Sequence, residues 1–268
     1  MQRITQRYRY SVILLRELVR TDFKLRYQGS ALGYLWSLLR PLALFVILYL
    51  VFAKIFKAGA AIPHYPVYLL LGIVLWNYFT EVTTGAVAAI VGKGDLLRKI
   101  NFPKYVIILA GSFSALINLA LNFIIIGVFM VINHVHLAMS ALLILPLIVE
   151  LFILALGVAF FLSALFVRFR DISYIWDVIM QAAFYATPIL YSLTIVPHRF
   201  AKFLILNPMA QIIQDARHAL VTPVSQTIYQ VYGGDKFIWA IPIGITLIVA
   251  ILAAMYFRSQ SKSFAEEV

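Results

Sequence analysis

The sequence predicts an all-α membrane protein with six transmembrane helices and both termini in the cytoplasm. Hydrophobic residues make up 63% of the 268 residues and charged residues only 12%, whereas a soluble globular domain has about 45–50% and about 25%. Six apolar stretches also reach the ~20 residues that a transmembrane helix needs. They lie at 35–56, 66–91, 105–133, 139–167, 173–192 and 238–257.

The basic residues predict the orientation of these spans. The net charge is +11, from 22 Lys and Arg against 11 Asp and Glu. Fifteen of the 22 cations fall in residues 1–34, 92–104, 168–172 and 258–268, and cytoplasmic segments carry such an excess. We therefore expect a cytoplasmic segment at 1–34, a six-helix transmembrane domain at 35–257 and a cytoplasmic tail at 258–268. The absence of cysteine excludes a disulfide-stabilised secreted domain.

The first 20 residues have the pattern of an amphipathic helix. Arginines occupy most of its surface, and apolar residues recur along one stripe at helical steps. The stripe consists of Ile4, Tyr8, Val12, Leu15 and Val19. Such a helix lies in the membrane interface. It either anchors the topology or docks another protein, and the pattern alone leaves both interpretations open.

The cytoplasmic loop 92–104 contains a Gly-Lys-Gly sequence that resembles a phosphate loop only superficially. A Walker A motif requires Gly at position 87 and Ser or Thr at position 94, where this chain has Val87 and Gly94. No nucleotide site is therefore expected on this chain. Asp95 is expected to cap a short helix, although the same residues would also fit a solvated turn.

The outer segment 193–237 has the pattern of two short amphipathic helices broken at Asn207-Pro208. Their apolar faces are too short to span a bilayer. They would enter the outer leaflet as a re-entrant hairpin, which requires that they pack against protein. The alternative is an ordinary outside loop that rests on the membrane surface.

Polar residues inside the predicted spans are few. Glu150 falls near the centre of the fourth span and Glu81 deep in the second, and a charge near the centre costs about 2.5–3.5 kcal/mol. Asn118 and Asn122 are four residues apart on one face of the third span. Such side chains either line a polar path and relay ions, or they form hydrogen bonds between helices.

Aromatic residues are abundant, with 15 Tyr, 20 Phe and 4 Trp. In the first span, Phe45, Tyr49, Phe52 and Phe56 recur at helical steps. Aromatic rings stack on sugar rings and Tyr hydroxyls add hydrogen bonds, so this face is a candidate lining for a glycan path. The same spacing also fits core packing or an interfacial belt.

The order of these segments, together with several motifs, resembles the type-2 ABC transporter permeases that export bacterial polysaccharides such as O-antigen, capsule and teichoic acid. The most specific match is the segment 20–41, RTDFKLRYQGSALGYLWSLLRP, although Thr21 separates Arg20 from Asp22. The family pattern falls on Asp22, Arg26, Tyr27, Ser30, Leu32, Gly33, Leu35, Trp36 and Pro41. Further matches are Asn101-Phe102-Pro103, Arg168-Phe169-Arg170-Asp171, Thr187-Pro188-Ile189 with Tyr191, and Asn207-Pro208 followed by Arg217.

The resemblance implies the permease subunit of an ATP-driven exporter in the bacterial cytoplasmic membrane. Its cargo would be a polysaccharide or polyol-phosphate polymer, in lipid-linked form. Two copies of the chain would associate with two separate ATPase subunits that hold ATP and Mg²⁺. This chain would contact glycan and membrane lipids, would need no cofactor or metal, and would bind no nucleic acid.

The resemblance also implies roles for individual residues. The residues that couple to the ATPase would be Arg16, Arg20, Asp22, Arg26, Asp95, Leu97, Arg98, Lys99, Arg170 and Asp171. The cytoplasmic entrance would include Trp36 and Arg40. The outer gate would include Asn207, Pro208 and Arg217. The path would be lined by Phe45, Tyr49, Phe52, Phe56, Phe184, Tyr185 and Tyr191.

Two other functions compete with this one. A permease of the same fold would carry a drug or a small lipid, but such permeases often lack the long outer hairpin and the dense aromatics. A multipass membrane glycosyl- or acyltransferase would need convergent acid–base or metal-binding residues. The one close histidine pair, His134 and His136, has no nearby carboxylate or third ligand in the sequence.

Overall fold

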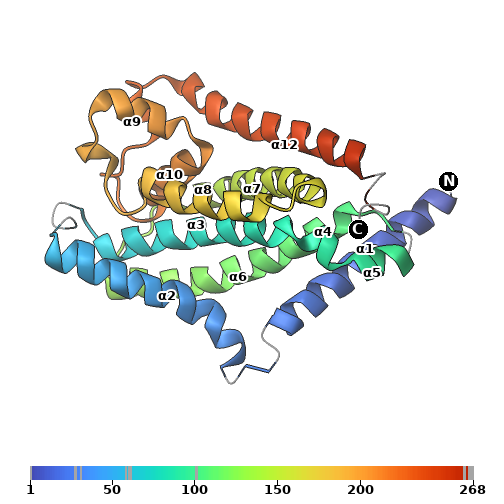
Figure 1. Cartoon of the computed structure of the whole chain (residues 1–268). Helices are drawn as coiled ribbons and strands as arrows, with labels where there is room; N and C mark the ends of the chain where they lie inside the picture. Colours follow the sequence, from blue (N-terminus) through green and yellow to red (C-terminus); the bar gives the residue numbers. More distant parts are fainter. Residues whose placement is uncertain are drawn as a thin grey trace.

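The computed structural model describes residues 2–26, 29–30, 32–57, 59, 62–99, 102–261 and 264. Every regular element in these ranges is a helix, and the helices form an elongated bundle (Figure 1). Five of them are long and apolar enough to cross a membrane. The predicted all-α class is confirmed, and five of the six predicted spans have such a helix.

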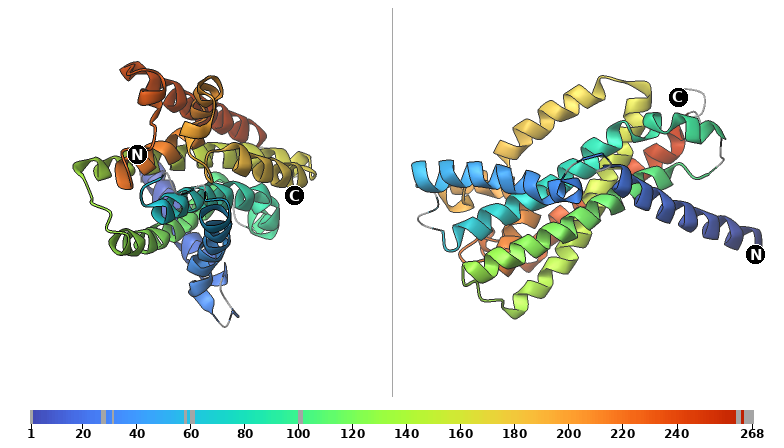
Figure 2. Two further views of the ribbon diagram at one scale, coloured as in Figure 1. Left: turned by 90° about the vertical axis from the view of Figure 1, so that its left-hand side faces the viewer. Right: turned by 90° about the horizontal axis from the view of Figure 1, so that it is seen from below.

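α1 (Gln2–Arg26) is the predicted N-terminal helix, and it extends beyond the amphipathic pattern of the first 20 residues. It packs against α6 (Tyr105–Ile132). Ser114 of α6 donates a hydrogen bond to the carbonyl of Val19, with an Oγ–O distance of 3.4 Å. Figure 2 shows the N-terminal part of α1 projecting beyond the bundle at one end. Its place in the membrane interface stays a prediction.

The first candidate span, Trp36–Ile55, changes its helical geometry near its C-terminal end. It begins as α2 (Trp36–Tyr49) and continues as a π-helical segment, Leu50–Ile55. The N–H of Phe56 donates to the carbonyl of Val51 across 2.9 Å, which is the five-residue spacing of a π-helix. The aromatic residues of this span therefore depart from a single α-helical stripe.

α3 (Tyr65–Val87) is the centre of the bundle. It packs against α2, α6, α7 (Ile144–Arg168) and α10 (Pro208–Leu220). It is the least apolar of the five candidate spans and also the most buried. Because protein surrounds it, polar side chains of α3 meet other helices: Trp176 Nε1 donates to Thr83 Oγ1 across 3.2 Å.

α7 and α12 (Ala240–Gln260) pack closely against each other. A Cβ atom on Gly157 of α7 would lie 2.9 Å from the Cα atom of Ala250 in α12. Glycine is needed here because the two backbones approach too closely for any side chain. One turn of 3₁₀-helix precedes each helix, at Met139–Leu143 and Lys236–Trp239, and completes the corresponding candidate span.

The predicted span 173–192 differs from the other five. Helix α8 (Ile172–Ala186) has 15 residues, or about 22 Å of helix, which is less than the ~30 Å hydrocarbon core. The chain becomes extended at Thr187, because a residue before proline avoids the helical conformation. Figures 1 and 2 show α8 running back from the end of α7 toward α9 and α10. Helix length therefore does not establish a sixth crossing.

The segment 193–237 contains the two predicted short helices broken at Asn-Pro and also a third short helix, α11 (Ile228–Val231). The two predicted helices are α9 (His198–Ile205) and α10 (Pro208–Leu220). The Oδ1 atom of Asn207 accepts a hydrogen bond from the N–H of Met209 across 3.0 Å. Asn207 is thus the N-cap of α10 and Pro208 its first residue. α10 is buried against α3, α7 and α12, which supplies the protein packing that a re-entrant hairpin requires.

The loop 92–104 contains the predicted short helix. α4 (Ala89–Gly92) is followed by α5 (Gly94–Lys99). Asp95 lies in the first turn of α5, so it is inside the helix, and the predicted N-cap position is wrong by two residues. α4, α5, the start of α1 and the end of α12 lie at one end of the bundle, and α9 lies at the other (Figures 1 and 2).

Candidate functional site

The side chain of Arg217 anchors α10 inside the protein. It is fully buried. Its Nε atom donates to the carbonyl of Tyr68 across 3.0 Å. Nη1 and Nη2 donate to the carbonyls of Pro188 and Ile189, each across 2.6 Å. One guanidinium therefore joins α10 to α3 and to the turn that follows α8.

The surroundings of Arg217 are built to hold its positive charge. The guanidinium lies 3.6 Å from the centre of the Tyr68 ring, a cation–π contact. A Cβ atom on Gly72 would lie 2.4 Å from Nη2, so only glycine leaves room for the guanidinium. Burial lowers the pKa of Arg217, but arginine stays protonated in proteins. Within the described residues no carboxylate lies within 4 Å of it.

A second buried polar group lies on the same helix. Gln211 Nε2 donates to Asp215 Oδ2 across 2.8 Å, and Glu150 of α7 faces this pair. Both Gln211 and Asp215 are buried, and burial raises the pKa of Asp215 to about 6. The hydrogen bond from Gln211 and the nearby His218 oppose that rise in pKa.

Glu81 and the two asparagines link α3 to its neighbours. Asn118 Nδ2 donates to Glu81 Oε1 across 2.8 Å. Asn122 Nδ2 donates to the carbonyl of Asn118 across 2.8 Å and to that of Ser37 in α2 across 3.3 Å. The contacts Asn118–Glu81 and Asn122–Ser37 are hydrogen bonds between helices, as one of the two sequence interpretations expected, whereas Asn122–Asn118 lies within α6.

An ion pair joins α1 to the loop 92–104. Lys93 Nζ lies 3.0 Å from Asp22 Oδ1 and 3.1 Å from Asp22 Oδ2. The sequence predicted that both segments contact an ATPase, but it did not pair these residues.

Lys104 ties the start of α6 to the end of α12 through a hydrogen bond to the carbonyl of Ser261, and burial lowers the pKa of Lys104.

The other predicted coupling residues fall into two groups. Asp95, Lys99, Arg170 and Asp171 are exposed, the last two in the turn between α7 and α8. Arg16 and Arg20 are exposed and line a groove between α1 and α6. The side chains of Arg26, Leu97 and Arg98 lie outside the described part of the structure, as do residues Tyr27 and Asn101 of the family motifs.

The predicted entrance residues lie in the first turns of α2. Trp36 and Arg40 are both exposed. They are four residues apart, and side chains at this spacing lie on one helix face. The structure therefore leaves them available to a ligand or to lipid.

The aromatic residues of the first span do not share one surface. Phe45 is 4% exposed and packs edge-on against Phe129 of α6, with ring centres 5.3 Å apart. Tyr49 and Phe52 are half-buried, whereas Phe56 is 68% exposed. Phe45 therefore serves the core of the chain in this conformation, and Phe56 is free to meet another molecule.

The aromatic residues near α8 have similarly mixed surroundings. Phe184 packs against Trp76 of α3, with ring centres 5.9 Å apart. Tyr185 is 67% exposed. Tyr191 donates a hydrogen bond from its hydroxyl to the carbonyl of Ala186 across 3.0 Å, which holds it beside the end of α8. Among these three residues, Tyr185 is the most accessible.

Two features of the site escaped the sequence interpretation. Gly72 lies in an apolar run, and no local pattern links it to Arg217, which is far away in the chain. Asp215 and Gln211 are four residues apart on one helical face, a spacing that would have predicted their hydrogen bond. Their neighbour Glu150 comes from another helix and has no such local signal.

The comparisons with known proteins agree with this architecture. The model of the ABC-2 type transporter family matches residues 13–221, a range that runs from α1 to the end of α10 and includes Arg217. The chain belongs to the ABC-2 type transporter family. Members of this family are membrane subunits of transporters, and the candidate surfaces are best considered as parts of an ABC-2 permease.

Several relatives of this ABC-2 chain have names that state a cargo. An O-antigen export system permease protein of Klebsiella pneumoniae is 30% identical over 205 residues, which cover 76% of this chain and 78% of the relative. One of Myxococcus xanthus is 26% identical over 270 residues, covering 99% and 98%. A polysialic acid transport protein of Escherichia coli is 23% identical over 225 residues, covering 81% and 82%.

Proposed function

We propose that this chain is the permease subunit of an ATP-driven exporter that moves a polysaccharide or polyol-phosphate polymer, in lipid-linked form, out across the bacterial cytoplasmic membrane. The observation that carries this proposal is the similarity to the Myxococcus O-antigen export permease, which extends over 99% of this chain and 98% of the relative. A similarity of this extent includes every candidate span and the outer hairpin. The function is that of a transport subunit and not of an enzyme.

The proposed topology has six crossings and both termini in the cytoplasm. α8 and the extended residues 187–192 would together make the fifth crossing. Arg168 at the end of α7 and Arg258 near the end of α12 support this orientation, because cytoplasmic helix ends carry such cations. α1 would lie at the cytoplasmic interface, and α9 and α10 would face the outer side.

The energy would come from two copies of a separate ATPase subunit that binds ATP and Mg²⁺. The exposed residues Asp95, Lys99, Arg170 and Asp171 would meet this subunit. The Asp22–Lys93 ion pair would transmit a displacement of the 92–104 loop to α1. The coupling roles of Arg16, Arg20, Arg26, Leu97 and Arg98 stay predictions.

A second copy of the chain would complete the cargo path. Met180 is the one buried residue of α8, and Phe56 and Tyr185 expose large aromatic surfaces. Two copies that meet across α2 and α8 would cover these surfaces and enclose a path between them. Trp36 and Arg40 would lie at its cytoplasmic entrance. Phe45 would support the lining from behind.

The outer gate would be the hairpin of α9 and α10. Asn207 and Pro208 determine where α10 begins, and Arg217 determines what it packs against. A gate that opens by moving α10 would have to break the contacts of Arg217 or carry α3 and the α8–α9 connection along with it.

Deletion of the gene in its native host tests the proposed function. We expect surface polysaccharide to disappear and lipid-linked polymer to accumulate inside the cell, with both effects reversed by the wild-type chain. A strain that expresses the chain with a catalytically inactive ATPase is the matched control and should resemble the deletion. Unchanged surface polysaccharide in the deletion strain would contradict the proposal.

A further inference from the structure

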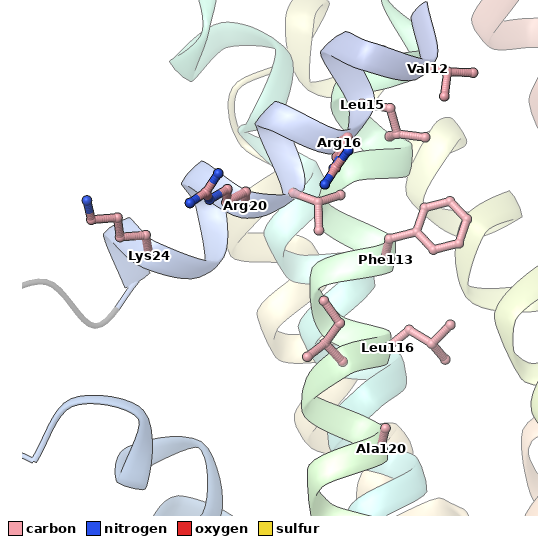
Figure 3. Close-up of a pocket in the computed structure, with 10 residues that line it drawn as sticks. Val12, Leu15, Arg16, Arg20, Lys24, Phe113, Leu116 and Ala120 are labelled. Carbon is pink, nitrogen blue, oxygen red and sulfur yellow. The ribbon is translucent and has the colours of Figure 1, made fainter.

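A large open groove separates α1 from α6. Its volume is about 1040 Å³. Its apolar walls come from Leu15 and Val19 of α1 and from Phe113, Ile117 and Ala120 of α6. The two helices touch where Ser114 bonds to Val19 and then diverge, so the groove widens away from that contact (Figure 3).

One edge of the groove is strongly basic. Arg16, Arg20 and Lys24 all line it. Figure 3 shows them in a row along α1, with Arg16 nearest to the α6 column of Phe113, Leu116 and Ala120 and Lys24 furthest from it. Residues four apart lie on the same face of a helix, about 6 Å apart along its axis. Within the described part of the chain, none of these three cations forms an ion pair.

The groove therefore combines apolar walls with a basic edge. Its walls require an apolar chain, and its edge requires an anion. A soluble anion would leave the walls exposed to water, and a neutral lipid would leave the cations without a partner. An anionic glycerophospholipid satisfies both, with its phosphate at the basic row and an acyl chain against α6.

The position of the groove along α6 fits the depth of such a lipid. α6 has 28 residues, or about 42 Å of helix, and exceeds the ~30 Å hydrocarbon core by about 12 Å. Phe113 lies eight residues after Tyr105, about 12 Å from the start of α6. If the excess length of α6 lies at the cytoplasmic end in the proposed orientation, Phe113 is close to the boundary between hydrocarbon and headgroups, next to the layer of lipid phosphates.

We propose that this groove is a binding site for an anionic glycerophospholipid of the cytoplasmic leaflet. The headgroup phosphate binds Arg16, Arg20 and Lys24, and one acyl chain fills the space between α1 and α6. The bound lipid holds α1 against the transmembrane domain. This site is separate from the proposed cargo path, and only its assignment to the cytoplasmic leaflet rests on the proposed orientation.

Lipid binding to the purified full-length chain tests this proposal directly. Native mass spectrometry in detergent would measure the retention of phosphatidylglycerol and of phosphatidylcholine, which has a net neutral headgroup. The wild type should prefer phosphatidylglycerol. The triple variant Arg16→Gln, Arg20→Gln, Lys24→Gln should lose this preference by about a hundredfold, since each cation near an anionic lipid contributes about fivefold.

Two further variants distinguish the contribution of the three cations from that of the apolar walls. The triple variant Lys54→Gln, Lys57→Gln, Arg199→Gln removes three exposed cations elsewhere and should keep the preference. Ala120→Trp fills the groove without changing its charge and should weaken the retention of both lipids. If the first triple variant keeps the preference, or if Ala120→Trp has no effect on retention, the proposal is wrong.

The same measurements identify the other possible occupants. If sn-glycerol 3-phosphate displaces phosphatidylglycerol at equal concentration, the site binds a free phosphate and the acyl chain is not part of recognition. If Ala120→Trp disrupts a dimer and leaves lipid retention unchanged, a second copy occupies the groove. If the ATPase subunit displaces the lipid completely, the groove is an ATPase contact. Each of these outcomes overturns the lipid proposal and leaves the proposed export function intact.

Discussion

At the residue scale, we expect substitution of Arg217 to cause the largest loss of stability. The variant Arg217→Met leaves the buried carbonyls of Pro188 and Ile189 without a donor, whereas the carbonyl of Tyr68 keeps its place in the hydrogen bonding of α3. Each carbonyl without a partner costs about 1–3 kcal/mol, so we expect a stability loss of at least about 2 kcal/mol and a loss of export. The apparent melting temperature in detergent measures the first effect, and surface polysaccharide measures the second.

Two comparisons make the Arg217 prediction specific. Arg199→Gln removes an exposed arginine from the neighbouring helix α9 and should change the melting temperature little. Gly72→Ala should act like Arg217→Met, because the new Cβ atom would lie 2.4 Å from Nη2. The effects of the two substitutions should not add in the double variant. Additive losses would mean that Gly72 acts independently of the guanidinium.

Asp215 is expected to make stability depend on pH. Burial raises its pKa from 3.8 to about 6, so between these values the folded protein holds a proton that the unfolded chain releases. The free energy of unfolding should therefore increase by about 1 kcal/mol as the pH falls from 7 to 5. Asp215→Asn should remove this gain in melting temperature.

The matched control for Asp215 is Asp177→Asn, which changes an exposed carboxylate of α8. It should leave the difference between pH 7 and pH 5 unchanged. Glu150 and His218 face Asp215, so the test is repeated in the Glu150→Gln background. An identical pH response in Asp215→Asn and in the wild type would mean that another group carries it.

At the scale of elements, the Asp22–Lys93 pair is expected to couple α1 to the loop 92–104. The two side chains are 25% and 26% exposed, so the pair contributes only about 0.2–1 kcal/mol to stability. Asp22→Lys and Lys93→Asp should each reduce export without unfolding the protein. The double charge reversal should restore it. If export is not restored, Asp22 acts through a different partner.

Substitutions at the contact between α3 and α6 distinguish a structural role of Glu81 from a role in relaying ions. Glu81→Gln keeps an oxygen that can accept from Asn118, so export and melting temperature should change little. Asn118→Leu removes the donor and should cost about 1–3 kcal/mol. A Glu81→Gln variant that folds normally but no longer exports would instead identify the carboxyl group as functional.

At the scale of the whole molecule, the proposed topology is testable because the chain has no cysteine. Thr194→Cys follows α8, whereas Ser173→Cys and Ser259→Cys lie at the opposite end of the bundle. A membrane-impermeant maleimide applied to intact cells, or to spheroplasts, should label the first and spare the other two. Labelling of Ser173→Cys and Thr194→Cys from the same side would show that α8 does not cross.

Much of the architecture could be predicted because it depends on local chemistry. An apolar run of ~20 residues has few alternatives to a membrane helix, and Asn-Pro ends one helix and begins the next through its own backbone geometry. The prediction was incomplete at 173–192, where Thr187-Pro188 ends α8 early. Apolar content alone did not reveal that break, because the residues after it are apolar too.

The sequence by itself determined the helical class, the five candidate spans, the helices α9 and α10, and the family. Periodicity, caps and motifs are properties of neighbouring residues. Only the tertiary structure decided that Arg217 meets Tyr68 and Gly72, that Asp22 meets Lys93, and that Phe45 is buried while Phe56 is exposed. It also decided that three cations of α1 line one apolar groove between α1 and α6. These outcomes depend on which helix faces pack together, and side chains distant in the chain determine that.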